Sequence, residues 1–260
     1  MEILGYIASL LIGLALGLLG GGGSILAIPV LIYLFAIEPV RASAYSLFIV
    51  GTASLMGTIG KHNEGNVSVR TGVLFGIPTV LAIFSTRKWF LPMIPDVLYQ
   101  AGGFVLTKRL FMMGFFILLM FAAALSMIRR RSAQQPPPSR RPFSQIALQG
   151  VSIGFITGLV GVGGGFLIVP ALIMLTGLPY KLAVGTSLLV IAMNCLAGFM
   201  GDALNYAMDW PFLLLITGLA VIGMIIGSRM ARRVPGATLK RSLGWFILAV
   251  AIWVLYRELT

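Results

Sequence analysis

Two glycine-rich segments hold the residues of this chain that are best suited to bind a ligand. Glycine costs about 1 kcal/mol relative to alanine inside a helix, so each segment should interrupt a helix. A half-helix that begins after each break, near Ser24 and Phe166, would direct unpaired N–H groups and roughly half a positive charge into the protein. Two such ends facing each other predict a cradle for one small anion. The segments read GLLGGGGSILAIP and GLVGVGGGFLIVP and contain Gly20, Gly21, Gly22, Gly23, Ser24, Gly161, Gly163, Gly164 and Gly165.

Neutral polar residues follow each glycine-rich segment and could complete this anion site without adding charge. Each of them has an ordinary alternative role, because small polar residues commonly make contacts between membrane helices. Tyr45 stands where the second half of the chain has Thr186, so we expect the first-half site to lack one hydroxyl. We include Ser46, Thr186, Ser187 and Asn194 in the predicted substrate-binding set.

The motifs that would indicate an enzyme or a cofactor site are incomplete in this sequence. The glycine-rich segments lack the lysine of a phosphate-binding loop, and Ile25 and Phe166 occupy the last position of the dinucleotide-binding pattern. The one histidine, His62, lies in a polar loop, and the one cysteine, Cys195, excludes a disulfide framework. No carboxylate pair or His/Cys/carboxylate cluster falls within an apolar run. We therefore predict no enzymatic activity, no catalytic residue, no metal and no cofactor.

The composition indicates a membrane protein built from helices. Of the 260 residues, 58% are hydrophobic and 10% are charged, with a mean hydropathy of +1.00. Soluble domains average about 25% charged residues, because their surface faces water. Membrane barrels read as short alternating strands, and that pattern is absent from the sequence. We predict an all-α polytopic membrane protein. The strongest apolar runs, which approach the roughly 20 residues that span a bilayer, are 44–60, 71–86, 110–128, 183–200, 212–227 and 243–256.

The net charge of +12 arises largely from short basic loops between apolar runs. In a soluble protein this excess would suggest nucleic acid, but in a membrane protein basic loops set the orientation. We predict that the loops 129–141 and 229–241 face the cytoplasm and that the partners are lipid and a small anion, with no nucleic acid. Glu2 and the lack of basic residues before the first apolar run indicate mature structure and not a cleaved signal peptide.

An internal repeat organises the chain. At an offset of roughly 140 residues, the glycines and proline of 13–34 fall on those of 154–175, and Ser46-Leu47 falls on Ser187-Leu188. Chance similarity between apolar sequences does not preserve spaced glycines and a proline, so the chain is a duplication. We divide it into a first membrane repeat, 1–128, a cytoplasmic linker, 129–145, and a second membrane repeat, 146–260. The linker contains RRRSAQQPPPSRR, which cannot bury apolar surface.

Both basic loops can face the cytoplasm only if an even number of crossings separates them. That condition holds if 146–176 enters the membrane, turns at its glycines and returns to the same side. Each repeat then has a glycine-broken hairpin followed by about three transmembrane helices, and the two repeats are inverted. The alternative is four spans per half, parallel repeats and a merely kinked first helix. The stretch 87–108 has no partner in the second half, and we interpret it as an irregular insertion at the membrane surface.

Four glycine pairs with GxxxG spacing indicate close packing between helices. Glycine at these positions lets two backbones approach closely. The pairs are Gly13/Gly17, Gly72/Gly76, Gly154/Gly158 and Gly223/Gly227.

Inverted repeats with broken helices are typical of secondary transporters, which bind substrate near the middle of the membrane. We therefore predict a secondary transporter of a small anion. A channel-like pore, or a membrane accessory subunit, is the alternative. The sequence does not identify the coupling ion or the direction of transport, and a homo-oligomer remains open.

The paired glycine segments, each followed by a small-residue helix containing YSL or GTSL, resemble the sulfite exporter TauE/SafE family. This family is also described as the four-toluene-sulfonate uptake permeases. The resemblance covers nearly the whole chain, including the GNV segment and the basic linker. It implies transport of sulfite, sulfonates, sulfoacetate-like or other small organic anions across the bacterial inner membrane.

Overall fold

The protein is described by a computed structural model, and the residues that it describes form mainly helices and one short β-hairpin. It describes residues 2–21, 23–90, 93, 95, 97–101, 104–129, 143–160, 165–203 and 208–259. The helices of the first half are α1 (Glu2–Leu19), α2 (Ser24–Tyr33), α3 (Pro39–Asn63), α4 (Val69–Ser85) and α6 (Lys108–Arg129). Those of the second half are α7 (Phe143–Val160), α8 (Gly165–Ala171), α9 (Tyr180–Ala203), α10 (Trp210–Arg232) and α11 (Gly236–Leu259).

Four helices of the described chain are long and apolar enough to cross a membrane. They contain the predicted runs 44–60, 71–86, 183–200 and 212–227, so the prediction of a polytopic helical protein is confirmed. The runs 110–128 and 243–256 are also helical, in α6 and α11. Within the first of these runs, Ile117–Ile128 forms an apolar helix that is shorter than the four long ones. Outer faces are strongly apolar. On α10, Leu214 and Leu215 are 56% and 51% exposed, as expected where lipid covers the surface.

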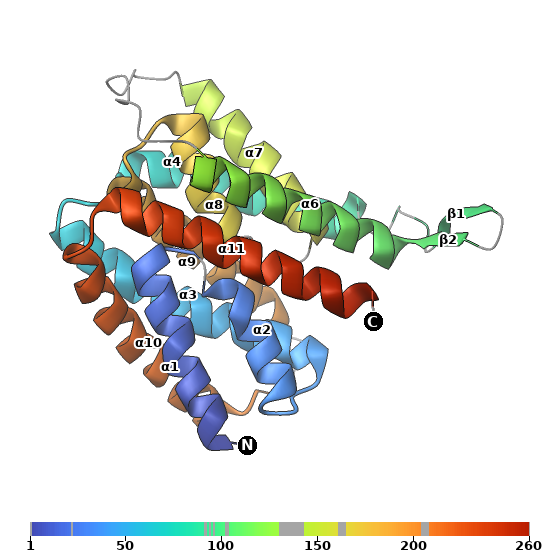
Figure 1. The fold of residues 1–260 in the computed structure, drawn as a ribbon, viewed down its shortest axis with the longest axis horizontal. Coiled ribbons are helices and arrows are strands. Elements are labelled where there is room, and N and C mark those ends of the chain that lie inside the picture. Colours follow the sequence, from blue (N-terminus) through green and yellow to red (C-terminus); the bar gives the residue numbers. More distant parts are fainter. Residues whose placement is uncertain are drawn as a thin grey trace.

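Glycine packing joins α1 to α10, which run in the same direction side by side (Figure 1). A Cβ added to Gly13 would overlap the backbone of Ala220, and one added to Gly17 would overlap that of Met224. On the α10 side of the same contact, Gly227 lies against the backbone of Leu14. The GxxxG prediction is confirmed for these two helices.

The helices α4 and α7 form a second close pair, and they also run in the same direction. Gly150 and Gly154 of α7 lie against the carbonyls of Phe75 and Thr79 of α4. The Thr79 hydroxyl also donates to the Gly150 carbonyl at 3.1 Å. The backbones of α4 and α7 therefore approach each other closely, as those of α1 and α10 do.

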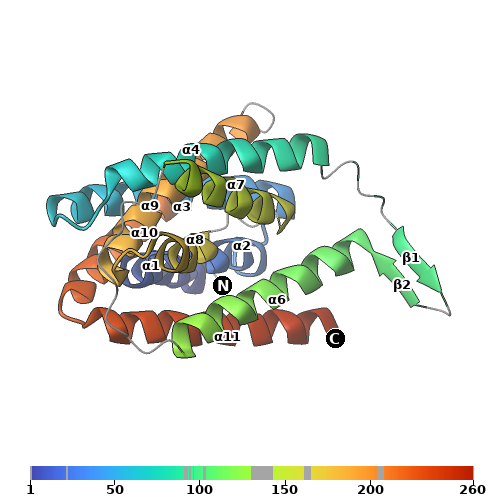
Figure 2. The same cartoon turned by 90° about the horizontal axis from the view of Figure 1, so that it is seen from above.

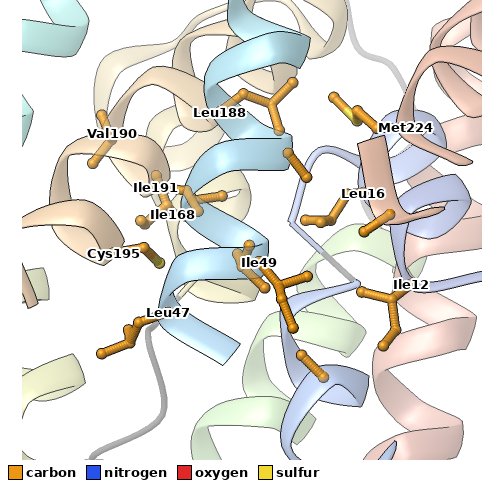
Figure 3. Packing of buried hydrophobic residues seen from close by; sticks show 14 of the residues in the cluster. Ile12, Leu16, Leu47, Ile49, Ile168, Leu188, Val190, Ile191, Cys195 and Met224 are labelled. Atoms are coloured by element: carbon orange, nitrogen blue, oxygen red, sulfur yellow. The ribbon is translucent and has the colours of Figure 1, made fainter. Parts of the chain in front are cut away.

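The helices α3 and α9 form the centre of the bundle and run antiparallel. Gly51 of α3 lies against Leu196 of α9, and Gly57, further along α3, lies against Leu188, earlier in α9. Figure 3 shows Leu16, Ile49 and Ile191, from three different helices, in one buried cluster. This cluster includes Leu16, near the end of α1, and Ile168 of α8.

The helices α6 and α11 form a separate layer, on the opposite side of the bundle from α4 and α7 (Figure 2). Gly244 of α11 lies against Met127 and Ile128 at the end of α6. A second buried cluster, which includes Met120 and Ile247, fills the space between this layer and the rest of the bundle.

The stretch 87–108 is more regular than the sequence predicted. The π-helical turn η1 (Thr86–Phe90) extends α4, and β1 (Val97–Ala101) pairs antiparallel with β2 (Phe104–Thr107). This hairpin projects away from the helices (Figure 2). The prediction of an irregular insertion is therefore wrong for its described part, because valine, leucine and tyrosine favour paired strands there.

Candidate functional site

The first glycine-rich segment breaks the chain between α1 and α2. The Gly20 N–H donates to the Leu16 carbonyl at 2.8 Å, and Gly20 then takes a left-handed conformation with φ of 76°. Only glycine adopts this conformation without strain, so the helix ends here. The Ser24 hydroxyl donates to the Gly21 carbonyl at 2.8 Å and fixes the start of α2.

The second glycine-rich segment separates α7, which ends at Val160, from α8, which begins at Gly165. Here α8 continues into a π-helical turn, η2 (Leu172–Thr176), which ends at Gly177 with φ of 74°. Four of the predicted site residues lie outside the described residues. They are Gly22, Gly161, Gly163 and Gly164.

The starts of α2 and α8 meet. A Cβ added to Gly165 would lie 2.7 Å from Ser24 Oγ and 3.3 Å from Ser24 Cβ. Neither helix carries an acidic residue in its first turn, so no side chain of those turns neutralises the positive helix ends. Of the predicted site residues, Ser24 and Gly165 are therefore brought together, and Gly21 and Gly23 lie beside them in the chain.

One face of α9 lies behind both breaks. The Ser187 hydroxyl lies 3.0 Å from the Gly20 carbonyl and 2.7 Å from the Val184 carbonyl, so it ties α9 to the first break. Ile191, one turn further along, would be 3.2 Å from a Cβ on Gly165. Asn194 follows after another turn on the same face, since residues i, i+4 and i+7 align on a helix. Ser187 therefore ties α9 to the backbone of the first break, and its role in substrate binding stays a prediction.

Asn194 has a buried amide group without a hydrogen-bond partner in the described part of the chain. The residue is 9% exposed, and both Oδ1 and Nδ2 lack a partner. An unsatisfied buried polar group costs about 1–3 kcal/mol, so such groups are rare unless something else satisfies them. A polar ligand or a bound water in the centre of the protein could do so.

Thr186 and Ser46 have other partners. Thr186 Oγ1 accepts a hydrogen bond from the Ser68 N–H at 3.0 Å, on the side of α9 that faces α4. The Ser46 hydroxyl donates to the Ser43 carbonyl within its own helix at 2.8 Å. The structure does not bring either hydroxyl to the contact between α2 and α8, and their role in substrate binding stays a prediction. Tyr45, at the position that corresponds to Thr186, accepts the Asp209 N–H at 2.8 Å.

A charged cavity near the first break was missed by the sequence reasoning. It has a volume of about 220 Å³ and lies where α3, α9 and α10 meet. Lys61 precedes His62, which the sequence analysis assigned to a polar loop, yet Lys61 lies in α3 and is only 6% exposed. Its Nζ lies 3.3 Å from Glu64 Oε2, and Arg232 Nε lies 2.7 Å from Glu64 Oε1. The spacing of Lys61 and Glu64 at a helix end was a signal of this ion pair.

The Glu64 carboxyl has a lowered pKa. Partial burial raises the pKa, but the charges of Lys61 and Arg232 and hydrogen bonds from Lys61 and Asn66 outweigh that effect. Glu64 is therefore ionised at neutral pH and bound by donors from three parts of the chain.

Comparison with known proteins assigns the family. The model of the family described as sulfite exporter TauE/SafE matches residues 5–254. A probable membrane transporter protein of Xylella fastidiosa (strain Temecula1) is 31% identical over 251 residues, 95% of this chain and 92% of that protein. A probable membrane transporter protein of Bacillus subtilis is 24% identical over 236 residues, 90% of this chain and 91% of that protein.

A plant relative is similar over a shorter region. The sulfite exporter TauE/SafE family protein 3 of Arabidopsis thaliana is 30% identical over 105 residues, 40% of this chain and 22% of that protein. The family match extends across both glycine-rich segments and every helix from α1 to α11. This chain therefore belongs to the sulfite exporter TauE/SafE family of membrane transporters.

Proposed function

We propose that this chain is a secondary transporter, an exporter or permease, of small anions in the bacterial inner membrane. Sulfite, sulfonates and related organosulfur or organic acids are the proposed substrates. The observation that carries the proposal is the contact between Ser24 and Gly165, which joins the positive ends of two half-helices. The unpartnered amide of Asn194, on the α9 face behind this contact, adds a neutral group that can bind an oxygen atom.

We further propose that the two halves are inverted repeats, as the sequence predicted. Reciprocal contacts support a two-fold relation between the halves, and the corresponding helices α3 and α9 run antiparallel, as inversion requires. Gly57 lies 3.2 Å from Leu188 Cδ1, and Gly198 lies 3.2 Å from Leu47 Cδ1, measured from an added Cβ. In the repeat alignment Gly57 corresponds to Gly198 and Leu47 to Leu188, so each contact is the counterpart of the other. A two-fold relation between the halves produces such pairs.

The same relation holds for two hydrogen bonds. The Tyr45 hydroxyl accepts the N–H of Asp209, the residue before α10, and the Thr186 hydroxyl accepts the N–H of Ser68, the residue before α4. In the repeat alignment Tyr45 corresponds to Thr186, and Ser68 corresponds to Asp209. The contact between Ser24 and Gly165 also joins corresponding positions, which supports an anion site on the proposed two-fold axis.

The directions of the broken hairpins agree with inversion. The end of α2 returns to the start of α1, because the Phe35 ring lies against Gly5 and packs on Phe212, near the start of α10. The end of α8 returns to the opposite end of the bundle, because Met174 lies in a small cavity with Lys240, near the start of α11. Two hairpins that enter from opposite sides and meet at their tips fit the transporter architecture.

Tight packing around the breaks favours a transporter over an open pore. Leu16, Ile168 and Ile191 are fully buried around the two half-helix starts (Figure 3). An anion reaches this region only if the helices move, as alternating access requires. A transporter of this kind should show solute counterflow in vesicles without electrical conductance.

A thermal-shift panel on the detergent-purified protein tests the substrate class. Sulfite, thiosulfate, sulfoacetate, taurine and simple carboxylates are compared, with chloride and sulfate at equal ionic strength as salt controls. A ligand at a hundredfold excess over its Kd stabilises the folded state by about 2.7 kcal/mol. A selective shift for one sulfur or organic anion supports the proposal. Equal shifts for all salts would contradict it.

A further inference from the structure

The charged cavity that lies beside the first break is built like an anion site. Its lining includes Lys61, Glu64, Asn66, Tyr180, Val184 and Arg232. At about 220 Å³ it exceeds many times the space of about 10–15 Å³ that one water needs. Lys181 also lines it, so three cationic side chains and one carboxylate face the cavity. An excess of cations in a cleft attracts anions.

Lys61 gives this cavity a buried positive charge. Its side chain is 7% exposed, and the partner shown for it is the Glu64 carboxylate, which is itself 15% exposed. Arg232 is different, because its side chain is 57% exposed and approaches Glu64 from the mouth of the cavity. Asn66 Nδ2 lies 3.3 Å from Glu64 Oε2. The donors that bind the Glu64 carboxylate would thus also suit the oxygen atoms of a free oxyanion.

Tyr180 supplies a second and independent observation. Tyr180 lines the cavity and is 7% exposed, and its hydroxyl has no hydrogen-bond partner among the described residues. Buried tyrosine hydroxyls usually find a partner. Glu64 does not use this donor, so one hydrogen-bond donor of the cavity remains free for a ligand.

Val184 connects the cavity to the first break. It lines the cavity, and its Cγ1 lies 2.6 Å from the position of a Cβ on Gly20. One turn further along α9, Ser187 binds the Gly20 carbonyl. The floor of the cavity is therefore the outer side of the segment where α1 breaks. An anion in the cavity is separated from the break by one layer of side chains.

We propose that this cavity is a second site for a small oxyanion, in which the anion displaces Glu64 from Lys61 and Arg232 and accepts a hydrogen bond from Tyr180. This inference rests on the proposed anion transport and adds an access site on the side of the loop 229–241. Glu64 holds the buried lysine neutralised when the site is empty. The anion takes over that role as it approaches the break.

Equilibrium binding of sulfite to the Gly165→Ala protein tests this site apart from the central one. The added methyl group obstructs the contact between α2 and α8 but lies away from the cavity. We expect this variant to retain sulfite binding. Tyr180→Phe in the same background should raise Kd about tenfold, the usual size for one hydrogen bond to a charged group. Glu64→Gln should lower Kd about tenfold, because the competing carboxylate is gone.

Stability and lipid controls accompany these variants. Tyr180→Phe removes only an unpartnered hydroxyl, so the melting temperature of the unliganded protein should stay the same or rise, even if Glu64→Gln folds poorly. Glu38→Gln is the matched control, because Glu38 forms an exposed pair with Arg41 at 3.9 Å far from the cavity. Titrations are made in phospholipid-free nonionic detergent and repeated with phosphatidylglycerol, whose headgroup offers the same phosphate-like oxygens.

Each result decides between the two proposals. Sulfite binding that Tyr180→Phe weakens and Glu64→Gln tightens, in detergent without phospholipid, supports the second site. A Kd that neither change alters, a complete loss of binding in Gly165→Ala, or binding of phosphatidylglycerol in place of sulfite would overturn it. Wild-type protein that shows no selective shift in the anion panel would instead contradict the proposed function.

Discussion

The hydroxyl of Ser24 lies where a methyl group on Gly165 would have to go, 2.7 Å from its Cβ position. These residues begin α2 and α8, from opposite halves of the chain. The contact leaves little room for a side chain at Gly165, and it brings the positive ends of two helix starts to one region. The proposed anion site depends on this contact.

A compensating substitution should restore the contact. Gly165→Ala alone should lower the transport rate at least tenfold, because its methyl group meets Ser24 Oγ. Adding Ser24→Gly removes that hydroxyl and should recover more than half of the wild-type rate in vesicles. Ser24→Gly by itself is the control. Failure of the double variant to recover, with Gly165→Ala folded, would show that the steric relation is not the cause.

Ser187→Ala should destabilise the protein by about 1–3 kcal/mol. The change leaves the buried Gly20 carbonyl without the hydroxyl that lies 3.0 Å away. Chemical denaturation in detergent measures the free energy of unfolding. Ser152→Ala is the matched control, because this exposed hydroxyl bonds only to Leu148 in its own helix. Equal small effects of the two substitutions would mean that the hydrogen bond between Ser187 and the first break does not contribute to the free energy of unfolding.

Asn194→Leu should separate stability from transport. Leucine has a similar shape and no polar atoms, so the unliganded protein should gain about 1–3 kcal/mol while transport falls. Met193→Leu, a volume-conserving change at the neighbouring position facing Gly76, is the control and should alter neither strongly. Melting temperature and uptake are measured on the same preparations. A destabilised Asn194→Leu protein would show that the amide has a partner within the fold.

Acid should remove the contribution of Glu64 to stability. Its pKa is lower in the folded protein than the value of about 4.3 in an unfolded chain. Its contribution is therefore present above that value and is lost as the pH falls through the folded pKa. Wild type should melt at a higher temperature than Glu64→Gln at pH 7, and the difference should shrink below about pH 4. A difference that is constant over this range would contradict the ion-pair interpretation.

Local residue chemistry explains what could be predicted from the sequence. The absence of a Cβ is a property of glycine itself, so the breaks before Ser24 and Gly165 and the packing at Gly13 and Gly17 follow from the sequence. The long apolar helices follow from composition in the same way. Membrane spans need no knowledge of distant partners.

Tertiary partners explain the rest. Thr186 was grouped with the anion site because of its type, but its hydroxyl binds the N–H of Ser68, which only the folded chain brings near. The burial of Lys61 depends on Glu64 and on Arg232, which arrives from α10. The sequence of 61–66 alone gives no sign of that distant partner. The β-hairpin of β1 and β2 likewise depends on pairing across its turn.

Counterflow of sulfite in vesicles that contain the purified protein tests the central claim most directly. Wild type and Gly218→Ala, whose added methyl group meets nothing within 4 Å, should exchange internal sulfite for labelled external sulfite at the same rate. Gly165→Ala, folded as judged by its melting curve, should exchange at least tenfold more slowly. Wild-type rates in Gly165→Ala would contradict anion binding where the starts of α2 and α8 meet.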